Sequence, residues 1–300
     1  MKLVVSREVS AARRSGRALV ALETSVLAQG LPFPANAEAA SRCDRAVRAA
    51  GAIPVPMAVI AGRLCAGLDE GQLQLLLRGS DLLKVGERDL ALAMAFQRTG
   101  GTTVSATCAM AAAAGVAVFA TGGLGGVHRG AEQDFDISQD LLAVSRWPVG
   151  VVCAGVKSVL DLPRTLELLE TLGVPVVGVG TRELPGFYSR ETGLQLEHQV
   201  ADAADAARVL RARRELGQGG VLFCLPPPEA TALPRRSVER HLDQALALAR
   251  RRQISGKAVT PFLLAQLAAR TRGRSLRANL ALLEHNAAFA GRLAVELARA

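Results

Sequence analysis

The chain has 300 residues, half of them hydrophobic, and its mean hydropathy is +0.24, which is enough apolar material for a large folded core. Every apolar run falls short of the ~18 residues that a membrane span needs, and the first residues turn polar too soon for a signal peptide. The net charge of +9 comes from short clusters in helical patterns without interleaved aromatic residues, which argues against a nucleic-acid-binding protein.

Seven apolar runs have the composition of buried strands, and helical patterns lie between most of them. In chain order these runs are 17–23, 52–60, 81–85, 116–120, 149–154, 174–179 and 221–225. Unbroken apolar strands that alternate with helices predict an α/β fold, with a mainly parallel sheet covered on both faces. Because the chain has no linker-like stretch and no repeat of 20–50 residues, residues 1–300 are predicted to form a single domain.

The five cysteines are scattered and form no Cys-x-x-Cys pair. They are Cys43, Cys65, Cys108, Cys153 and Cys224. Each lies in an apolar or helical context, so we expect reduced, buried thiols in a cytoplasmic protein and no zinc site.

Polar groups follow several of the predicted strands. In an open parallel sheet, ligands bind outside the carboxyl ends of the strands. The first strand ends in Glu23, the third carries Lys84, the fourth runs into a glycine-rich loop at 121–126, and the fifth leads to Lys157. Lysine is otherwise rare, since Lys257 is the only further one beyond the start of the chain. The sequence therefore predicts a carboxylate, two ammonium groups and a glycine-rich loop at one rim.

The glycine-rich loop predicts a phosphate cradle, because its backbone N–H groups can approach a ligand closely. It matches neither G-x-G-x-x-G nor the P-loop. His128 follows it, as a general acid, a phosphate contact or a structural histidine. Asp134, Asp136 and Asp140 come next, and the last two would share a face if the segment were helical. Such carboxylates suit a hard cation, Mg²⁺ or Mn²⁺, or an acidic helix cap.

A lysine beside apolar strand residues loses hydration, which favours its neutral, nucleophilic amine. Such an amine can attack a carbonyl or anomeric carbon and form a Schiff base. Glu23 would supply the acid that this chemistry needs. The residues alone indicate a metal-assisted, lysine-nucleophile enzyme that acts on a small phosphorylated substrate.

Six stretches of the chain carry a resemblance to a known family. They are "ALETSVLAQGLPFPANAEAA", "GTTVSAT", "FATGGLGGVHRGAEQDFDISQDL", "VVCAGVKSVLDLPRTLE", "FYSRETG" and "VTPFLL". In this order, over nearly the whole chain, they resemble the pseudouridine-5′-phosphate glycosidases, also called the indigoidine synthase A-like family. The resemblance implies a three-layer α/β/α sandwich, a homotrimer, and the reversible cleavage, with Mn²⁺, of the C–C glycosidic bond of pseudouridine 5′-phosphate to uracil and ribose 5-phosphate.

The resemblance also implies roles for individual residues. Lys157 matches the nucleophile, Glu23 the proton donor and Asp136 the metal ligand, with waters completing the metal shell. Predicted substrate contacts are Lys84, Val104, Ser138, Gln139, Asp140 and Asn279, together with Thr121 at the start of the glycine-rich loop.

Three positions depart from the family pattern. Gln139 stands where alanine is usual, His285 where asparagine is usual, and Arg274 where an acidic residue is often found. If their side chains reach the substrate, they would alter its binding at one edge of the pocket.

Two other functions fit the residues. A Schiff-base aldolase or lyase on another sugar phosphate would share the lysine but would release no free base. A non-catalytic sugar-phosphate-binding module would bind without turnover. Analysis of the products separates all three functions.

Overall fold

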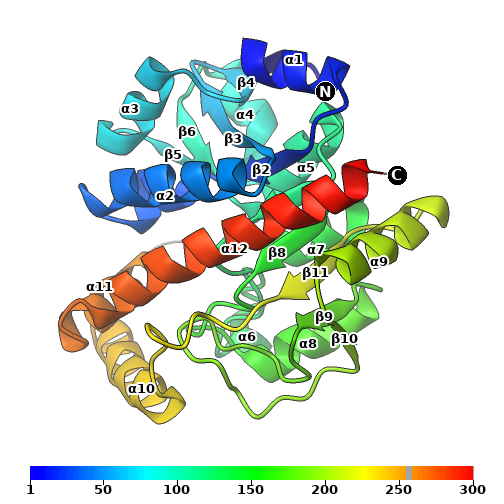
Figure 1. Ribbon diagram of the computed structural model, residues 1–300. Coiled ribbons are helices and arrows are strands. Elements are labelled where there is room, and N and C mark those ends of the chain that lie inside the picture. The colour runs from blue at the N-terminus through cyan, green and yellow to red at the C-terminus, as the bar shows by residue number, and fades with distance from the viewer. Residues whose placement is uncertain (255–258, 300) are drawn as a thin grey trace.

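The computed structural model describes residues 1–254 and 259–299, and Lys257 lies outside them. An 11-stranded, mainly parallel sheet runs through the molecule (Figure 1). The strands are β1 (Val4–Val5), β2 (Leu19–Leu22), β3 (Ile53–Ile60), β4 (Arg63–Ala66), β5 (Leu83–Val85), β6 (Gly100–Thr102), β7 (Val118–Ala120), β8 (Gly150–Cys153), β9 (Val176–Val179), β10 (His198–Val200) and β11 (Val221–Cys224). Their order along the sheet is β1-β4-β3-β2-β7-β8-β11-β9-β10, with β6 beside β3 and β5 beside β6.

Strand β3 joins two parts of this sheet. Its first half pairs with β2 in parallel, from Leu19 opposite Ile53 onward, and so belongs to the parallel centre. Its second half pairs antiparallel with β4 and β6, and β6 in turn pairs with β5 in parallel. We call the part formed by β4, β5, β6 and the second half of β3 the lateral lobe, which stands beside the central sheet. Strand β5, which carries Lys84, therefore belongs to this lobe.

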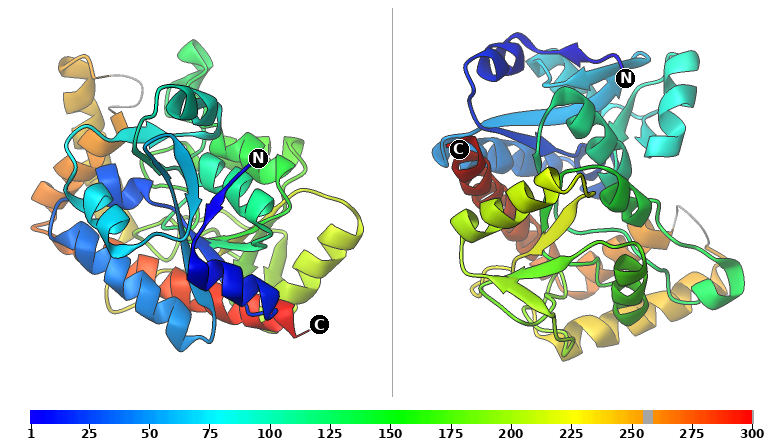
Figure 2. Two further views of the ribbon diagram at one scale, coloured as in Figure 1. Left: turned by 90° about the horizontal axis from the view of Figure 1, so that it is seen from above. Right: turned by 90° about the vertical axis from the view of Figure 1, so that its right-hand side faces the viewer.

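Helices cover both faces of the sheet, which confirms the predicted α/β fold. The helices are α1 (Arg7–Arg14), η1 (Val26–Gly30), α2 (Ala35–Ala49), α3 (Glu70–Arg78), η2 (Glu87–Asp89), α4 (Leu90–Ala95), α5 (Val104–Ala114), α6 (Ala131–Asp134), α7 (Asp140–Arg146), α8 (Leu162–Thr171), α9 (Ala203–Glu215), α10 (Arg235–Arg251), α11 (Val259–Arg270) and α12 (Arg274–Ala298). On one face α12 packs against α2 and α9, and its pairing with α2 is visible in both views of Figure 2. On the other face, α5, α7 and α8 pack in series.

Each face has its own apolar core. The core under α5 and α7 includes Cys108, Phe119 and Leu141, whereas the core under α12 includes Phe223 and Phe289. A third apolar cluster lies among α10, α11 and the first part of α12. Among the described residues, no helix is both long and apolar enough to cross a membrane, the 25-residue α12 included.

All seven predicted strands are present, and four short strands were missed. The missed strands are β1, β4, β6 and β10. They have two to four residues each, and β6 is Gly-Gly-Thr, so they carry no apolar run that a sequence pattern could detect. The five cysteines are free thiols, four of them buried and Cys43 half-buried.

Candidate active site

A cavity of about 720 Å³ lies at the carboxyl ends of the strands. Glu23, Lys84 and Lys157 line it together with glycines of the loop after β7, so the predicted meeting of strand ends at one rim is confirmed. Other predicted site residues that line the cavity are Asp136, Ser138, Gln139, Asp140 and Asn279. Val104 and Thr121 are buried and are not part of the cavity wall.

The backbone on both sides of Lys157 is held firmly. Strand β8 ends at Cys153, and Gly155 then adopts a left-handed φ of +86°, where a Cβ atom would lie 2.2 Å from the carbonyl oxygen of Pro185. The Lys157 N–H donates to the carbonyl of Leu124 at 3.0 Å. Only glycine fits at position 155, and the half-buried Lys157 is thereby fixed against the glycine-rich loop.

Two hydroxyl groups hold the Glu23 carboxylate. Glu23 directly follows β2 and is 8% exposed. The Thr121 hydroxyl donates to its Oε1, and the Ser25 hydroxyl donates to its Oε2 at 2.7 Å. The structure therefore places Thr121 behind Glu23, as a positioning group. Ser25 was missed, although its place two residues after Glu23 was a usable signal.

The glycine-rich loop is packed and bonded mainly within the protein. The N–H of Gly125 donates to Asp140 at 3.1 Å, and that of Leu124 donates to the carbonyl of Gly155 at 3.0 Å. A Cβ atom at Gly125 would lie 2.4 Å from the Ser138 hydroxyl, and one at Gly123 would lie 2.5 Å from the ring of Phe187. Close packing accounts for glycine at positions 123 and 125, and the phosphate cradle stays a prediction.

Asp140 and Asp136 have different surroundings. The segment between them is not helical, because α7 begins only at Asp140, so the condition for a shared helix face is not met. Asp140 is buried and accepts N–H groups from Ser105 at 2.9 Å and from Gly125, so it joins the start of α5 to the loop. The side chain of Asp136 is 38% exposed and lies 3.8 Å from Nδ1 of His128.

His128 borders the cavity between opposing charges. Burial is the main cause that lowers its pKa, the charges of Lys84 and Lys157 lower it further, and Asp136 opposes the shift. The balance favours a neutral imidazole beside the Asp136 carboxylate.

The carboxylates that line this cavity in the described part of the chain are Glu23, Asp89, Asp136 and Asp140. No group of three or more His, Cys, Asp or Glu side chains within residues 1–254 and 259–299 is arranged to hold a metal. Mg²⁺-like ions usually keep several waters and need only one or two carboxylates besides substrate phosphate. Asp136 lines the cavity and is partly exposed, whereas both oxygens of Asp140 already accept hydrogen bonds.

Of the three departures from the family pattern, only Gln139 reaches the cavity. Its Oε1 accepts the backbone N–H of Arg88 at 3.2 Å, which ties the start of α7 to the loop after β5. Arg274 and His285 are not part of the wall.

Several wall residues were missed from the sequence. Arg88, Thr103 and Ser105 add polar groups near Lys84, and Phe187 and Leu264 add apolar surface from distant loops and helices. Arg88 was accessible to sequence reasoning, as it follows Lys84 by four residues, but Phe187 and Leu264 reach the cavity only through the tertiary fold.

Comparison with known proteins identifies a family. The family described as "Indigoidine synthase A like protein" matches residues 8–296. The chain is 62% identical, over all of both chains, to a pseudouridine-5′-phosphate glycosidase of Myxococcus xanthus. It is 55% identical to one of Gemmatimonas aurantiaca, across 94% of this chain and 92% of that one.

Two solved structures share the fold. One is the prealnumycin C-glycosynthase AlnA in complex with ribulose 5-phosphate, with a TM-score of 0.92 and 36% identity over 99% of this chain and 97% of that one. The other is an indigoidine synthase A-like protein from Thermotoga maritima, with a TM-score of 0.88 and 36% identity over 95% and 94% of the two chains.

Proposed function

The chain belongs to the indigoidine synthase A-like family, and we propose that it is an enzyme that reversibly cleaves the C–C glycosidic bond of pseudouridine 5′-phosphate. The observation that carries this proposal is the meeting of Glu23 and Lys157 in one cavity, at the ends of β2 and β8, with Lys84 on the same wall. The names of the relatives supply the substrate, and the AlnA complex supports a pentose phosphate in a cavity of this fold.

The first step uses both catalytic residues. In our proposal Nζ of Lys157 attacks C1′ of the ribose while Glu23 gives a proton to the ring oxygen. The bond between C1′ and the ring oxygen breaks, and the sugar opens as an amine adduct on Lys157. The fixed backbone of Lys157 and the two hydroxyl groups on Glu23 support this assignment, because the backbone that carries the amine and the carboxylate of Glu23 are both held before substrate arrives.

In the second step, the Glu23 carboxylate takes a proton from the nitrogen of the adduct, and the lone pair that this frees forms a C=N bond as the bond between C1′ and uracil breaks. Uracil takes a proton at the carbon that was attached to the sugar, because this bond has no leaving oxygen or nitrogen to protonate. Water then hydrolyses the imine and returns Lys157 with ribose 5-phosphate. A Schiff base thus provides the electron acceptor that simple hydrolysis lacks.

We assign Mn²⁺ or a similar hard cation to Asp136, with waters completing its shell. When bound, such a cation would supply positive charge that stabilises negative charge on the substrate. The partial exposure of Asp136 on the cavity wall supports this assignment.

The substrate phosphate is assigned to Lys84, Ser138 and the start of α5. Lys84 and Ser138 line the cavity, as do Thr103 and Ser105 on either side of Val104. Val104 is the first residue of α5, and the first-turn N–H groups of a helix have no acceptor within it. Val104 itself is buried outside the wall, so its neighbours Thr103 and Ser105 support this assignment rather than Val104.

The homotrimer and the cytoplasmic location also belong to the proposal. The family resemblance supports the trimer, and the five free thiols fit a reducing compartment.

The test is product analysis after incubation with pseudouridine 5′-phosphate and Mn²⁺. We expect free uracil and ribose 5-phosphate in equal amounts, and the reverse reaction when both are supplied. Two carbonyl fragments from another sugar phosphate, without free base, would indicate an aldolase instead. Binding without turnover would indicate a sugar-phosphate-binding module.

A further inference from the structure

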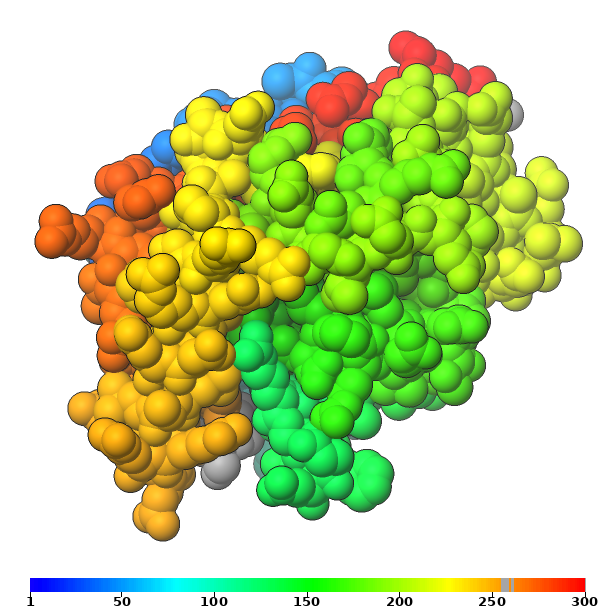
Figure 3. Space-filling model, turned by 90° about the horizontal axis from the view of Figure 1, so that it is seen from below, coloured from blue at the N-terminus to red at the C-terminus, as the bar shows by residue number. Residues whose placement is uncertain are grey.

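A second cavity, of about 940 Å³, lies behind the loop that carries Lys157. Its walls come from segments 129–134, 158–164 and 186–194 and from helix α10. Figure 3 shows this face of the molecule, hollowed between the yellow-orange residues of α10 and the green residues beside them. Leu160 lines both cavities, so they share a wall.

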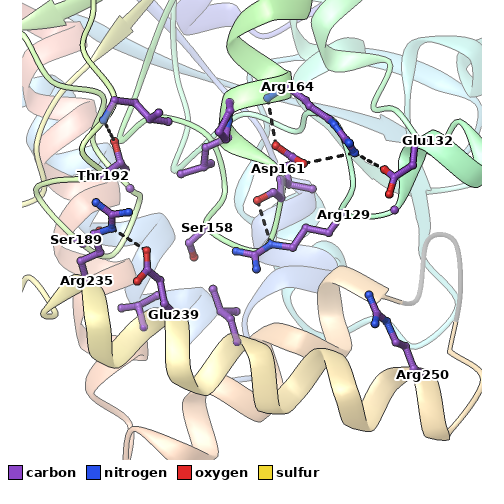
Figure 4. A pocket seen from close by; sticks show the side chains of 18 of the residues that line it. Arg129, Glu132, Ser158, Asp161, Arg164, Ser189, Thr192, Arg235, Glu239 and Arg250 are labelled. Carbon is purple, nitrogen blue, oxygen red and sulfur yellow. Dashed lines mark hydrogen bonds and ion pairs between the residues drawn. The ribbon is translucent and has the colours of Figure 1, made fainter.

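The hydroxyl of Ser158 has no partner within the described part of the chain. Ser158 is only 8% exposed, and its Oγ makes no hydrogen bond there. It lines the second cavity, near the centre of the view in Figure 4. An unpaired buried hydroxyl costs stability, so a polar atom of a ligand is a fitting partner for it.

Two guanidinium groups stand on opposite sides of Ser158 in Figure 4. Arg129 contacts the Leu160 carbonyl at 3.4 Å and the exposed Asp243 at 3.3 Å. Arg235, at the start of α10, donates through Nε to Glu239 at 2.7 Å. A guanidinium has five N–H donors, so these contacts leave several of them for a ligand.

The carboxylates of the wall are mostly engaged elsewhere. Glu132 and Asp161 pair with Arg164, and Asp134 accepts the backbone N–H of Asp136 at 3.0 Å. Around Ser158, the guanidinium of Arg129 pairs with the exposed Asp243 and that of Arg235 pairs with Glu239, and both keep N–H donors that these pairings do not use. This arrangement favours an anion with several oxygens, because guanidinium forks bind such groups in a bidentate manner.

We propose that the second cavity binds a small oxyanion, either phosphate or a phosphate monoester, through Arg129, Arg235 and the Ser158 hydroxyl. The site is separate from the cavity that holds Lys84 and Lys157, and its binding can be measured without turnover. The proposal therefore does not depend on the proposed function.

The experiment is calorimetric titration of a protein in which Lys84→Ala and Lys157→Ala remove both lysines of the first cavity. We expect this protein to bind inorganic phosphate still, and adding Arg129→Gln and Arg235→Gln to weaken that binding at least about tenfold. Adding Ser158→Ala should weaken it by a smaller factor. Adding Arg208→Gln, on the exposed side of α9, is the matched control and should leave it unchanged.

Ribose 5-phosphate in place of phosphate identifies the source of the anion. Tighter binding of the ester points to a phosphate monoester, and tighter binding of phosphate points to the free ion. Either order supports the site if the Arg129→Gln and Arg235→Gln substitutions weaken the binding of both ligands. Crystals grown with arsenate should give an anomalous peak within hydrogen-bond distance of Ser158 Oγ. Two results would overturn the proposal. One is no binding after removal of the two lysines, and the other is binding that the Arg129→Gln and Arg235→Gln substitutions leave unchanged.

Discussion

Lys157 is one of the two lysines on the wall of the first cavity within residues 1–254 and 259–299, and the contacts around it distinguish it from Lys84. Its backbone is bonded to the glycine-rich loop, whereas Lys84 stands on the lateral lobe. We expect Lys157→Ala to lower kcat at least about 1,000-fold, because a nucleophile cannot be replaced by binding alone. Circular dichroism should show an unchanged fold.

Borohydride trapping checks the same assignment chemically. Reduction during incubation with ribose 5-phosphate should attach the sugar to Lys157 and to no other residue, as read by peptide mass spectrometry. The Lys84→Ala protein is the matched control and should still be labelled at Lys157. Labelling at Lys84, or a Lys157→Ala protein with a near-normal rate, would contradict the assignment.

Asp136 is the carboxylate to which we assign the metal, since both oxygens of Asp140 and both oxygens of Glu23 already accept hydrogen bonds. Chelation should remove most of the activity, and Mn²⁺ should restore it. In the Asp136→Asn protein, we expect that about 10–100-fold more Mn²⁺ is needed to restore half of the activity. Electron paramagnetic resonance of Mn²⁺ should show the same weakening of binding. Full activity after exhaustive chelation would mean that Asp136 is structural.

At the scale of elements, the loop after β7 depends on a close approach at Gly125. A Cβ atom there would lie 2.4 Å from the hydroxyl of Ser138 and 2.5 Å from a carboxylate oxygen of Asp140. We expect Gly125→Ala to cost about 1–3 kcal/mol of unfolding free energy, as overpacking does. It should also lower kcat/KM, because Asp140 would lose its contact with the loop. Thermal denaturation and kinetics measure the two effects.

Gly71→Ala is the control for this substitution. Gly71 lies in helix α3, and a Cβ atom there would approach no atom closer than 3.4 Å. Alanine should be neutral or stabilising by up to about 1 kcal/mol. Equal effects at both positions would show that the packing around Gly125 is looser than the distances indicate.

The elements that the sequence predicted are those with a strong local signal. Strands such as β8 are continuous apolar runs, and α5 ends at Gly115, which adopts the left-handed conformation that its glycine permits. The lateral lobe was not predicted, because β6 has no apolar run and β3 changes from parallel to antiparallel pairing along its length.

At the scale of the whole molecule, the first cavity combines residues that are far apart in sequence. Thr121 binds Glu23 across 98 residues, and Asp140 binds the start of α5 across 35. The strand-end rule predicted Glu23, Lys84 and Lys157 at one rim, since the topology of a parallel sheet places its strand ends together. It did not predict Phe187 or Leu264, whose places depend on how loops and helices pack over the rim.

Recognition of the substrate phosphate depends on this assembly. Lys84 comes from the lateral lobe and Ser138 from the loop before α7, and both line the cavity that holds Lys157. Uracil and ribose are neutral, so the phosphate is the one charged group of the substrate that the protein can bind electrostatically. Each charge-assisted contact is worth about 1.5–3 kcal/mol. We therefore expect unphosphorylated pseudouridine to be used at least about 100-fold less efficiently, which corresponds to about 2.7 kcal/mol.

Lys84→Ala tests where that phosphate lies. If Lys84 binds the phosphate, its removal should lower kcat/KM for pseudouridine 5′-phosphate far more than for pseudouridine, because only the first substrate loses a contact. Lys2→Ala, at an exposed position near the start of the chain, is the matched control and should change neither value. Equal losses for the two substrates would mean that Lys84 serves the ring chemistry or the fold. The phosphate would then have to lie against other cationic groups of the wall. Among these groups, Arg88 is the nearest to Lys84 in sequence.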